Sequence, residues 1–189
     1  MPDKPTAPIK NRYYGIGAVF LLVILSCILY WNTLHNDFVF DDMPLIWGSK
    51  VVPRLNSVYD IVNLFAEKYG YRPIRTLSYA IDYRFSGTGP VSYHVSNIIY
   101  HAFTALLVYL VTISLIPQQA TALAAALIFA VHPVHTDAVA YLSGRRDILF
   151  ALFYLAGFWC FVRHRKRNRL PYLMAAMVLY LLSIGVSWI

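Results

Sequence analysis

The sequence predicts an all-α, polytopic membrane helix bundle with about five spans. Of its 189 residues, 59% are hydrophobic and only 13% are charged, whereas soluble domains carry about 25% charged residues. Five apolar segments approach the roughly 20 residues that a spanning helix needs. Lys and Arg clusters flank these segments, as the positive-inside rule expects. The net charge of +7 therefore does not indicate nucleic-acid binding.

The first span is predicted from Tyr14 to Leu34. Residues 1–13 precede it and contain three basic residues, which favours a cytoplasmic N-terminal tail. A signal peptide is the alternative. The apolar stretch is longer than a signal h-region, however, and no small-residue cleavage pattern follows it. We therefore expect a retained anchor.

Residues 36–90 are too polar to span a bilayer and form a large loop. Ser57-x-x-Asp60 matches a capping box, and a second helix can begin at Pro73 and end at Gly87. Apolar residues follow helical spacing at Val58, Ile61, Val62 and Phe65 in the first helix, and at Leu77, Ile81 and Phe85 in the second. Because neither helix is long enough to span, we expect both to be amphipathic surface helices.

Four further apolar segments follow this loop. They are predicted at residues 91–116, 120–134, 148–162 and 170–189. A tight turn at Pro117, a polar turn from His135 to Asp147 and a basic block at residues 163–169 separate them. If the N-terminus is cytoplasmic, successive spans cross the membrane in alternate directions. The 36–90 loop and the 135–147 turn then lie together on the extracytoplasmic side.

An acidic pair, Asp41 and Asp42, lies just beyond the first span. Adjacent carboxylates at the mouth of a membrane bundle, followed by a loop rich in Arg and Tyr, indicate a site. Polar residues also recur on one helical stripe of the second span, at His94, Asn97, His101 and Thr104. Such residues usually face the bundle interior or a cavity. Interhelical hydrogen bonding explains Asn97 and Thr104 equally well, while His94 lies near the loop and could line a site.

The third span ends in Ala-Val-His132-Pro-Val-His135-Thr-Asp137. Imidazole and carboxylate ligands suit Zn or Mn, but His-x-x-His alone does not complete a metal signature, so we predict no metal. The other interpretation is a polar wall that binds an anionic group.

Arginines at two places are candidate ligands for such an anion. Arg72 and Arg75 stand at the start of the second surface helix, and Arg145 and Arg146 follow Ser-Gly after the third span. Arginine binds phosphate through two parallel hydrogen bonds. One of Arg145 and Arg146 is instead expected to extend toward the membrane interface.

Five motifs occur in order over roughly residues 36–150. They are Phe-Val-Phe-Asp41-Asp42, Tyr71-Arg72-Pro73-Ile74-Arg75, Tyr93-His94-x-x-Asn97, Ala130-Val131-His132-Pro133-Val134-His135-Thr136-Asp137-Ala138-Val139 and Gly144-Arg145. Together they resemble the membrane part of the transmembrane-and-tetratricopeptide-repeat O-mannosyltransferases, in the GT-C superfamily of glycosyltransferases. No motif alone is specific, but the combination is.

The resemblance implies that residues 14–189 form the N-terminal part of a GT-C-like membrane module. It implies inverting transfer of a sugar, mannose in particular, from a polyprenyl- or dolichyl-phosphate donor to a protein Ser or Thr hydroxyl. Asp41 or Asp42 would be the catalytic base. The departing phosphate needs positive charge and hydrogen-bond donors, for which the candidates are Arg72, Arg75, Arg145, His132 and His135. His94 and Asp137 complete the predicted substrate- and phosphate-binding set. No cofactor is expected.

The chain also departs from this family. Its later spans and tetratricopeptide repeats are absent, and residues 182–189 lack the Lys and Glu of a Ser-Lys-Glu-like motif. We therefore expect a partial chain that could need a second chain to complete its site. Two alternatives stay open: a non-catalytic membrane protein that binds lipid phosphate or a partner, and a metal-dependent enzyme built on His132, His135 and Asp137.

Overall fold

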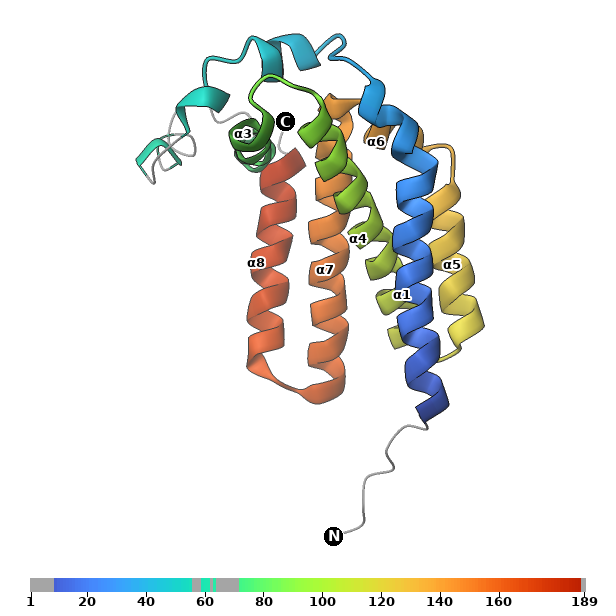
Figure 1. Ribbon diagram of the computed structural model, residues 1–189. Coiled ribbons are helices and arrows are strands. Elements are labelled where there is room, and N and C mark those ends of the chain that lie inside the picture. The colour runs from blue at the N-terminus through green and yellow to red at the C-terminus, as the bar shows by residue number, and fades with distance from the viewer. Residues whose placement is uncertain (1–8, 56–58, 62, 64–71, 188–189) are drawn as a thin grey trace.

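The computed structural model describes residues 9–55, 59–61, 63 and 72–187. Its regular elements within these residues are all helical, which confirms the all-α prediction. Five long helices form the bundle: α1 (Ile9–Tyr30), α4 (Val91–Leu115), α5 (Gln119–Val131), α7 (Arg145–Arg167) and α8 (Leu170–Ser187). They run alongside one another, with the connecting segments gathered at the two ends (Figure 1).

The lengths and composition of these helices are those of a membrane protein. The segments Gly15–His35, Val91–Leu115 and Leu142–Arg167 are long and apolar enough to cross a bilayer, while α5 and α8 are apolar but shorter. The third span was predicted to reach residue 134, but α5 ends at Val131. Pro133 disfavours the helical conformation of the residue before it, and His132 is accordingly extended (φ −66°, ψ 126°).

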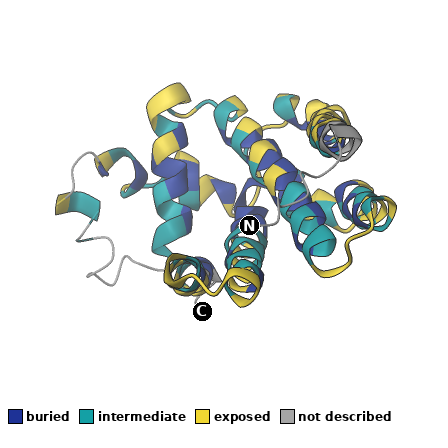
Figure 2. Ribbon diagram, turned by 90° about the horizontal axis from the view of Figure 1, so that it is seen from below, coloured by how far each residue is buried: buried dark blue, intermediate teal, exposed yellow. Residues whose placement is uncertain are grey.

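Helix α4 lies at the centre of the bundle, where it packs against α1, α5 and α7. Three alanines at four-residue spacing, Ala122, Ala126 and Ala130, are completely buried along one face of α5, in a cluster with Leu22 of α1 and Ala105 of α4. Small residues allow helix backbones to approach closely within a membrane. Buried residues concentrate where the helices face one another (Figure 2), and many large apolar side chains of the spans are exposed.

The second predicted surface helix is present as α3 (Pro73–Ser86), with proline in its first turn and Gly87, at φ 59°, after its last residue. Its buried residues are Arg75, Ser78, Tyr79, Ala80 and Asp82. Ile81 and Phe85, from the predicted apolar side, are 49% and 82% exposed. Helix α3 thus turns a mainly polar face toward the bundle and an apolar face outward, as a helix at a membrane surface does. The first predicted surface helix, near residues 57–65, lies mostly outside the described residues.

The stretch predicted as a polar turn, residues 135–147, instead contains the short helix α6 (His135–Ala140) and a 3-10 turn (Leu142–Gly144), and α7 already begins at Arg145. The Thr136 N–H donates to the Pro133 carbonyl (3.0 Å), which starts the new helical turn immediately after the break. The other short elements are the helical turns Trp31–His35, Met43–Trp47 and Val52–Arg54.

Candidate functional site

The two carboxylates of the acidic pair lie in different environments. Asp42 is 1% exposed. Its Oδ1 accepts hydrogen bonds from the Ser143 backbone N–H (2.8 Å) and hydroxyl (2.6 Å), and its Oδ2 accepts one from the Val39 N–H (3.2 Å). Asp42 therefore joins the first loop to the turn before α7, across 101 residues of sequence.

Asp41 is exposed. Its backbone N–H donates to the Tyr141 hydroxyl oxygen (3.2 Å), and its carbonyl accepts from the Leu45 N–H (3.1 Å). The two peptide groups that flank the Asp41 Cα are thereby both held by hydrogen bonds, while the residue itself is exposed. Of the two predicted catalytic acids, Asp41 has the accessible carboxylate.

Arg75 brings positive charge to the same region. It is 4% exposed, and its Nε is a buried donor without a hydrogen-bond partner among the described residues. Burial lowers the pKa of the Arg75 guanidinium, and the positive charges of Arg72 and Arg146 lower it further, while Tyr79 and Asp41 raise it. Two further arginines and Asp41 therefore lie within electrostatic range of Arg75, and a group of arginines suits the binding of an anion.

Arg145 does not belong to this group, although the sequence suggested it as a phosphate ligand. Its side chain is completely buried and forms an ion pair with Asp82 of α3 (2.5 Å). Its guanidinium also donates to Asn97 Oδ1 (2.7 Å), the Tyr93 carbonyl (2.7 Å) and Ser78 Oγ (3.2 Å). A guanidinium enclosed in this way cannot contact a lipid phosphate in this conformation, so the expected role of Arg145 does not fit the structure.

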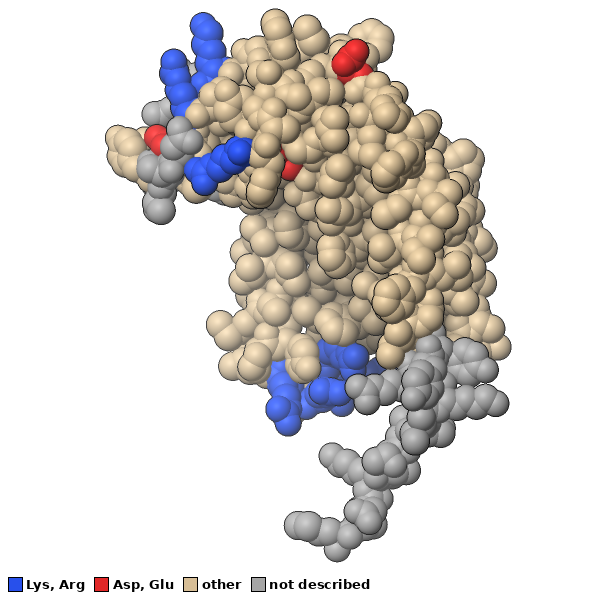
Figure 3. All heavy atoms as spheres, viewed as in Figure 1, with Lys and Arg blue, Asp and Glu red and all other residues tan. Residues whose placement is uncertain are grey.

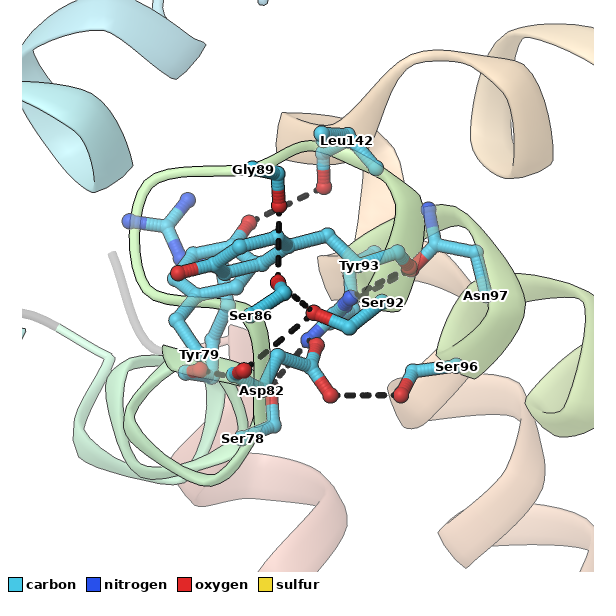
Figure 4. A network of polar contacts seen from close by, with 12 residues as sticks. Ser78, Tyr79, Asp82, Ser86, Gly89, Ser92, Tyr93, Ser96, Asn97 and Leu142 are labelled. Carbon is cyan, nitrogen blue, oxygen red and sulfur yellow. Dashed lines mark hydrogen bonds and ion pairs between the residues drawn. The ribbon is translucent and has the colours of Figure 1, made fainter. Parts of the chain in front are cut away.

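The network around Arg145 joins α3, α4 and α7 (Figure 4). The Arg145 guanidinium carbon lies 4.7 Å from the centroid of the Tyr79 ring, and the Tyr79 hydroxyl donates to the Leu142 carbonyl (3.0 Å). Burial raises the pKa of Tyr79 to about 12, so this phenol keeps its proton. Asp82 also accepts from the Ser96 hydroxyl (2.5 Å). The network fixes the position of the turn that holds Asp42.

Sequence reasoning missed Asp82 and Tyr141, and it did not commit Arg146 to the site. Asp82 carried one signal, since it is a lone carboxylate seven residues after Arg75 and therefore on the same face of α3. Tyr141 gave no local signal, because its contact with Asp41 spans 100 residues of sequence. Which of Arg145 and Arg146 has its side chain inside the bundle depends on the residue at which α7 begins.

His94 is buried near the acidic pair. It is 1% exposed, close to the backbone of Asn36 and within electrostatic range of Asp42. The predicted position near the first loop is therefore observed, but the imidazole is enclosed and does not line an open surface.

The remaining predicted residues form a separate group around α6. His135 contacts the rings of Phe129, His101 and His132, with ring centroids 4.2, 5.6 and 6.1 Å apart. It borders a cavity of about 190 Å³ whose wall also includes His101, Thr104 and Asp147. Burial, and secondarily the nearby His132, lower the pKa of His135. His132 and Asp137 are exposed.

The sequence left a metal site open for this second group. Within the part of the chain that the structure describes, no three His, Cys, Asp or Glu side chains are arranged to hold a metal ion. Of the predicted site residues, Asp41, Asp42, Arg72 and Arg75 thus lie in one region, to which the structure adds Arg146. His94 and Arg145 are buried. His132 and His135 lie in a separate group.

Comparison with known proteins places these residues in a family context. The family described as dolichyl-phosphate-mannose-protein mannosyltransferase matches residues 53–188. The chain is 33% identical over 174 residues to protein O-mannosyl-transferase F38B6.6 of Caenorhabditis elegans, which covers 84% of this chain and 25% of that protein. It is 31% identical to human protein O-mannosyl-transferase TMTC3 (90% of this chain, 20% of that protein) and 33% identical to Drosophila melanogaster protein O-mannosyl-transferase Tmtc1 (85% and 20%).

The chain spans only about a fifth to a quarter of the length of these curated relatives. No solved structure matches it. The family match extends over most of the chain and includes α3 to α8. The chain therefore belongs to the dolichyl-phosphate-mannose-protein mannosyltransferase family.

Proposed function

We propose that this chain forms the base-bearing part of an inverting membrane glycosyltransferase. The enzyme transfers a sugar, mannose in particular, from a polyprenyl- or dolichyl-phosphate donor to a Ser or Thr hydroxyl of a protein. The observation that carries the proposal is the different environment of the two acids: Asp42 is bonded to Ser143, while Asp41 is exposed and within electrostatic range of Arg75.

Asp41 is the catalytic base of this reaction. A hydroxyl is a weak nucleophile and needs a positioned base. The Asp41 carboxylate accepts the hydroxyl proton as the acceptor oxygen attacks the anomeric carbon of the sugar. The bond from that carbon to the phosphate oxygen breaks, and the lipid phosphate leaves with the electron pair. One displacement inverts the anomeric configuration.

The three arginines stabilise the leaving phosphate. Because the leaving group is already a weak base, no general acid is required, and fixed positive charge lowers the energy of the developing anion. Arg75 supports this role because its buried Nε–H has no hydrogen-bond partner among the described residues. Arg72, immediately before α3, and Arg146, in α7, add positive charge. In this proposal Arg146 has the phosphate-stabilising role that the sequence suggested for Arg145.

The reacting end of the bundle is extracytoplasmic in this proposal, and the N-terminus is cytoplasmic. Arg165, Lys166 and Arg167 are exposed in the last turn of α7, and Arg169 is exposed just before α8. Basic side chains thus lie at the end of the molecule away from α3 (Figure 3). Cytoplasmic loops are enriched in such residues. A further part of the protein, or a partner chain, supplies the rest of the acceptor and lipid sites.

Transfer by the protein in nanodiscs tests the proposal. A polyprenyl-phosphate-mannose donor and a Ser/Thr peptide are supplied to the wild type, to Asp41→Asn and to Asp37→Asn, which replaces another exposed aspartate of the same loop. We expect Asp41→Asn to lower kcat by about 100-fold or more, in line with the loss of a general base, and Asp37→Asn to remain active. Transfer that survives Asp41→Asn would rule out this base. Donor binding without transfer by the wild type would favour a non-catalytic lipid-phosphate protein.

A further inference from the structure

Phe40, the residue before the candidate base, has an unusual conformation. Its φ is 47°, in the left-handed region that bulky residues rarely adopt. Its side chain is 86% exposed. This position is unfavourable for an aromatic residue in two ways: the positive φ strains the backbone, and the exposed ring is not buried. A strained residue persists only where the surrounding structure holds it, and such residues concentrate at functional sites.

The turn around Phe40 supplies that constraint. The Asp42 N–H donates to the Val39 carbonyl (2.9 Å), and the Met43 N–H donates to the Phe40 carbonyl (3.2 Å). The Asp42 carboxylate closes the same turn through the Val39 N–H and anchors it to Ser143. The conformation of Phe40 is thus set by the same contacts that present Asp41.

Apolar side chains continue from Phe40 along the next helical turn. Val39, Met43 and Trp47 are 46%, 42% and 57% exposed. The Met43–Trp47 turn lies over the end of the bundle (Figure 1), whereas the lipid chains of a bilayer contact the sides of the spans. An apolar surface at this end, next to a base that must contact the acceptor hydroxyl, is suited to binding a polypeptide.

We propose that Phe40 is an acceptor-positioning residue, whose ring contacts the polypeptide segment that carries the Ser or Thr hydroxyl. The proposal rests on the function proposed above. Consecutive Cα atoms are about 3.8 Å apart, so any polypeptide whose hydroxyl reaches Asp41 passes close to Phe40. Aromatic side chains, Phe included, are enriched in protein–protein interfaces. Met43 and Trp47 extend the contact to apolar side chains that flank the acceptor residue.

Photocrosslinking tests the contact without requiring transfer. The photoreactive residue p-benzoylphenylalanine replaces Phe40 in one variant and Phe85 in another, in nanodiscs with a labelled Ser/Thr peptide. Phe85 is a matched control because it is 82% exposed but lies in α3. We expect peptide crosslinks from position 40 and few from position 85. Equal crosslinking from both positions, or crosslinks to lipid alone from position 40, would overturn the proposal.

Kinetics separate the ring from the strained backbone. Phe40→Ala and Phe40→Gly both remove the ring, but only glycine adopts positive φ without strain. We expect both variants to raise the acceptor KM by roughly tenfold, as the loss of an aromatic anchor does, with donor KM little changed and Phe40→Tyr close to wild type. A normal acceptor KM in Phe40→Gly refutes the role of the ring even where Asp41→Asn abolishes transfer. Transfer that survives Asp41→Asn instead refutes the base and leaves the crosslinks to test Phe40.

Discussion

Arg145 and Arg146 are neighbours in the sequence with opposite environments. Arg145 is paired with Asp82 inside the bundle, and both side chains are almost completely buried. Arg146 is paired with Asp147 at the surface (2.9 Å), where the two side chains are 38% and 55% exposed. Removing one partner of a buried pair leaves an uncompensated charge in a low-dielectric interior, whereas solvent screens an exposed pair. The two pairs should therefore respond very differently to mutation.

The first prediction compares Asp82→Asn with Asp147→Asn. Asp82→Asn should lower the free energy of unfolding by about 3–5 kcal/mol because Arg145 stays buried and charged, while Asp147→Asn should change it by about 0–1 kcal/mol. Thermal unfolding in detergent measures both. A double variant, Asp82→Leu with Arg145→Met, should be more stable than Asp82→Leu alone. Equal effects of the two single changes would contradict a structural role for the buried pair.

The second prediction concerns His135. The pKa of this imidazole is lowered from its ordinary value of 6.5 by burial and then by His132. Below pH 6.5 the unfolded chain binds a proton that the folded chain resists, so the His135 contribution to stability should fall as pH drops from 6.5 toward the folded pKa. Unfolding curves between pH 7.5 and 5 should show a smaller loss for His135→Gln than for the wild type. An unchanged pH profile in His135→Gln would show that other groups carry the effect.

At the scale of elements, the junction between α6 and α7 holds the acidic pair through Tyr141 and Ser143, and it positions Arg145 and Arg146. Gly144 is required there for space, since its φ of −67° is ordinary. A Cβ atom at this position would lie 2.7 Å from the Asp137 carbonyl oxygen and 2.9 Å from Ala138 Cα. The two short elements therefore pack backbone against backbone, and this contact sets where α7 begins.

The third prediction follows from that close approach. Gly144→Ala should destabilise the protein by about 1–3 kcal/mol, the usual range for overpacking, and should reduce transfer because Ser143 moves relative to Asp42. Gly17→Ala in α1 is the control, because a Cβ there meets no atom within 4 Å and alanine favours a helix. Its stability should be equal to or above that of the wild type. Differential scanning fluorimetry in detergent distinguishes them, and no loss in Gly144→Ala would disprove the packing argument.

On the scale of the whole molecule, the end of the bundle away from α3 shows basic side chains, whereas the end that carries α3 shows both basic and acidic side chains (Figure 3). The basic last turn of α7 and the turn to α8 lie at one end, and α3 with the candidate site lies at the other (Figures 1 and 3). Residues 148–187 contain no Asp or Glu, so nothing in this segment offsets its positive charge. A membrane protein with this asymmetry should insert with the basic end in the cytoplasm.

The fourth prediction tests this orientation. Single cysteines are introduced as Asp60→Cys and Arg167→Cys after Cys27 and Cys160 are replaced by serine. A membrane-impermeant thiol reagent should label position 60 only from the extracytoplasmic side and position 167 only from the cytoplasmic side. Labelling of position 60 from the cytoplasm would reverse the proposed topology and move the site to the other face of the membrane.

The all-α bundle could be predicted from composition, apolar segment lengths and basic flanks, because these properties are local and reflect the bilayer as solvent. The α3 helix was also predictable, since Pro73 and Gly87 mark its ends through their own backbone preferences. The start of α7 was not, because the contact of Gly144 with the backbone of α6 depends on residues brought together only by folding.

The sequence by itself determined that this protein is a membrane helix bundle of the mannosyltransferase family and that Asp41, Asp42 and several arginines are candidate site residues. Only the tertiary structure decided their environments. It buried Arg145 against Asp82, left Arg146 near Arg75, bonded Asp42 to Ser143 and exposed Asp41. The physical reason is that burial and hydrogen-bond partners distinguish chemically identical side chains, and both depend on contacts between residues far apart in the sequence.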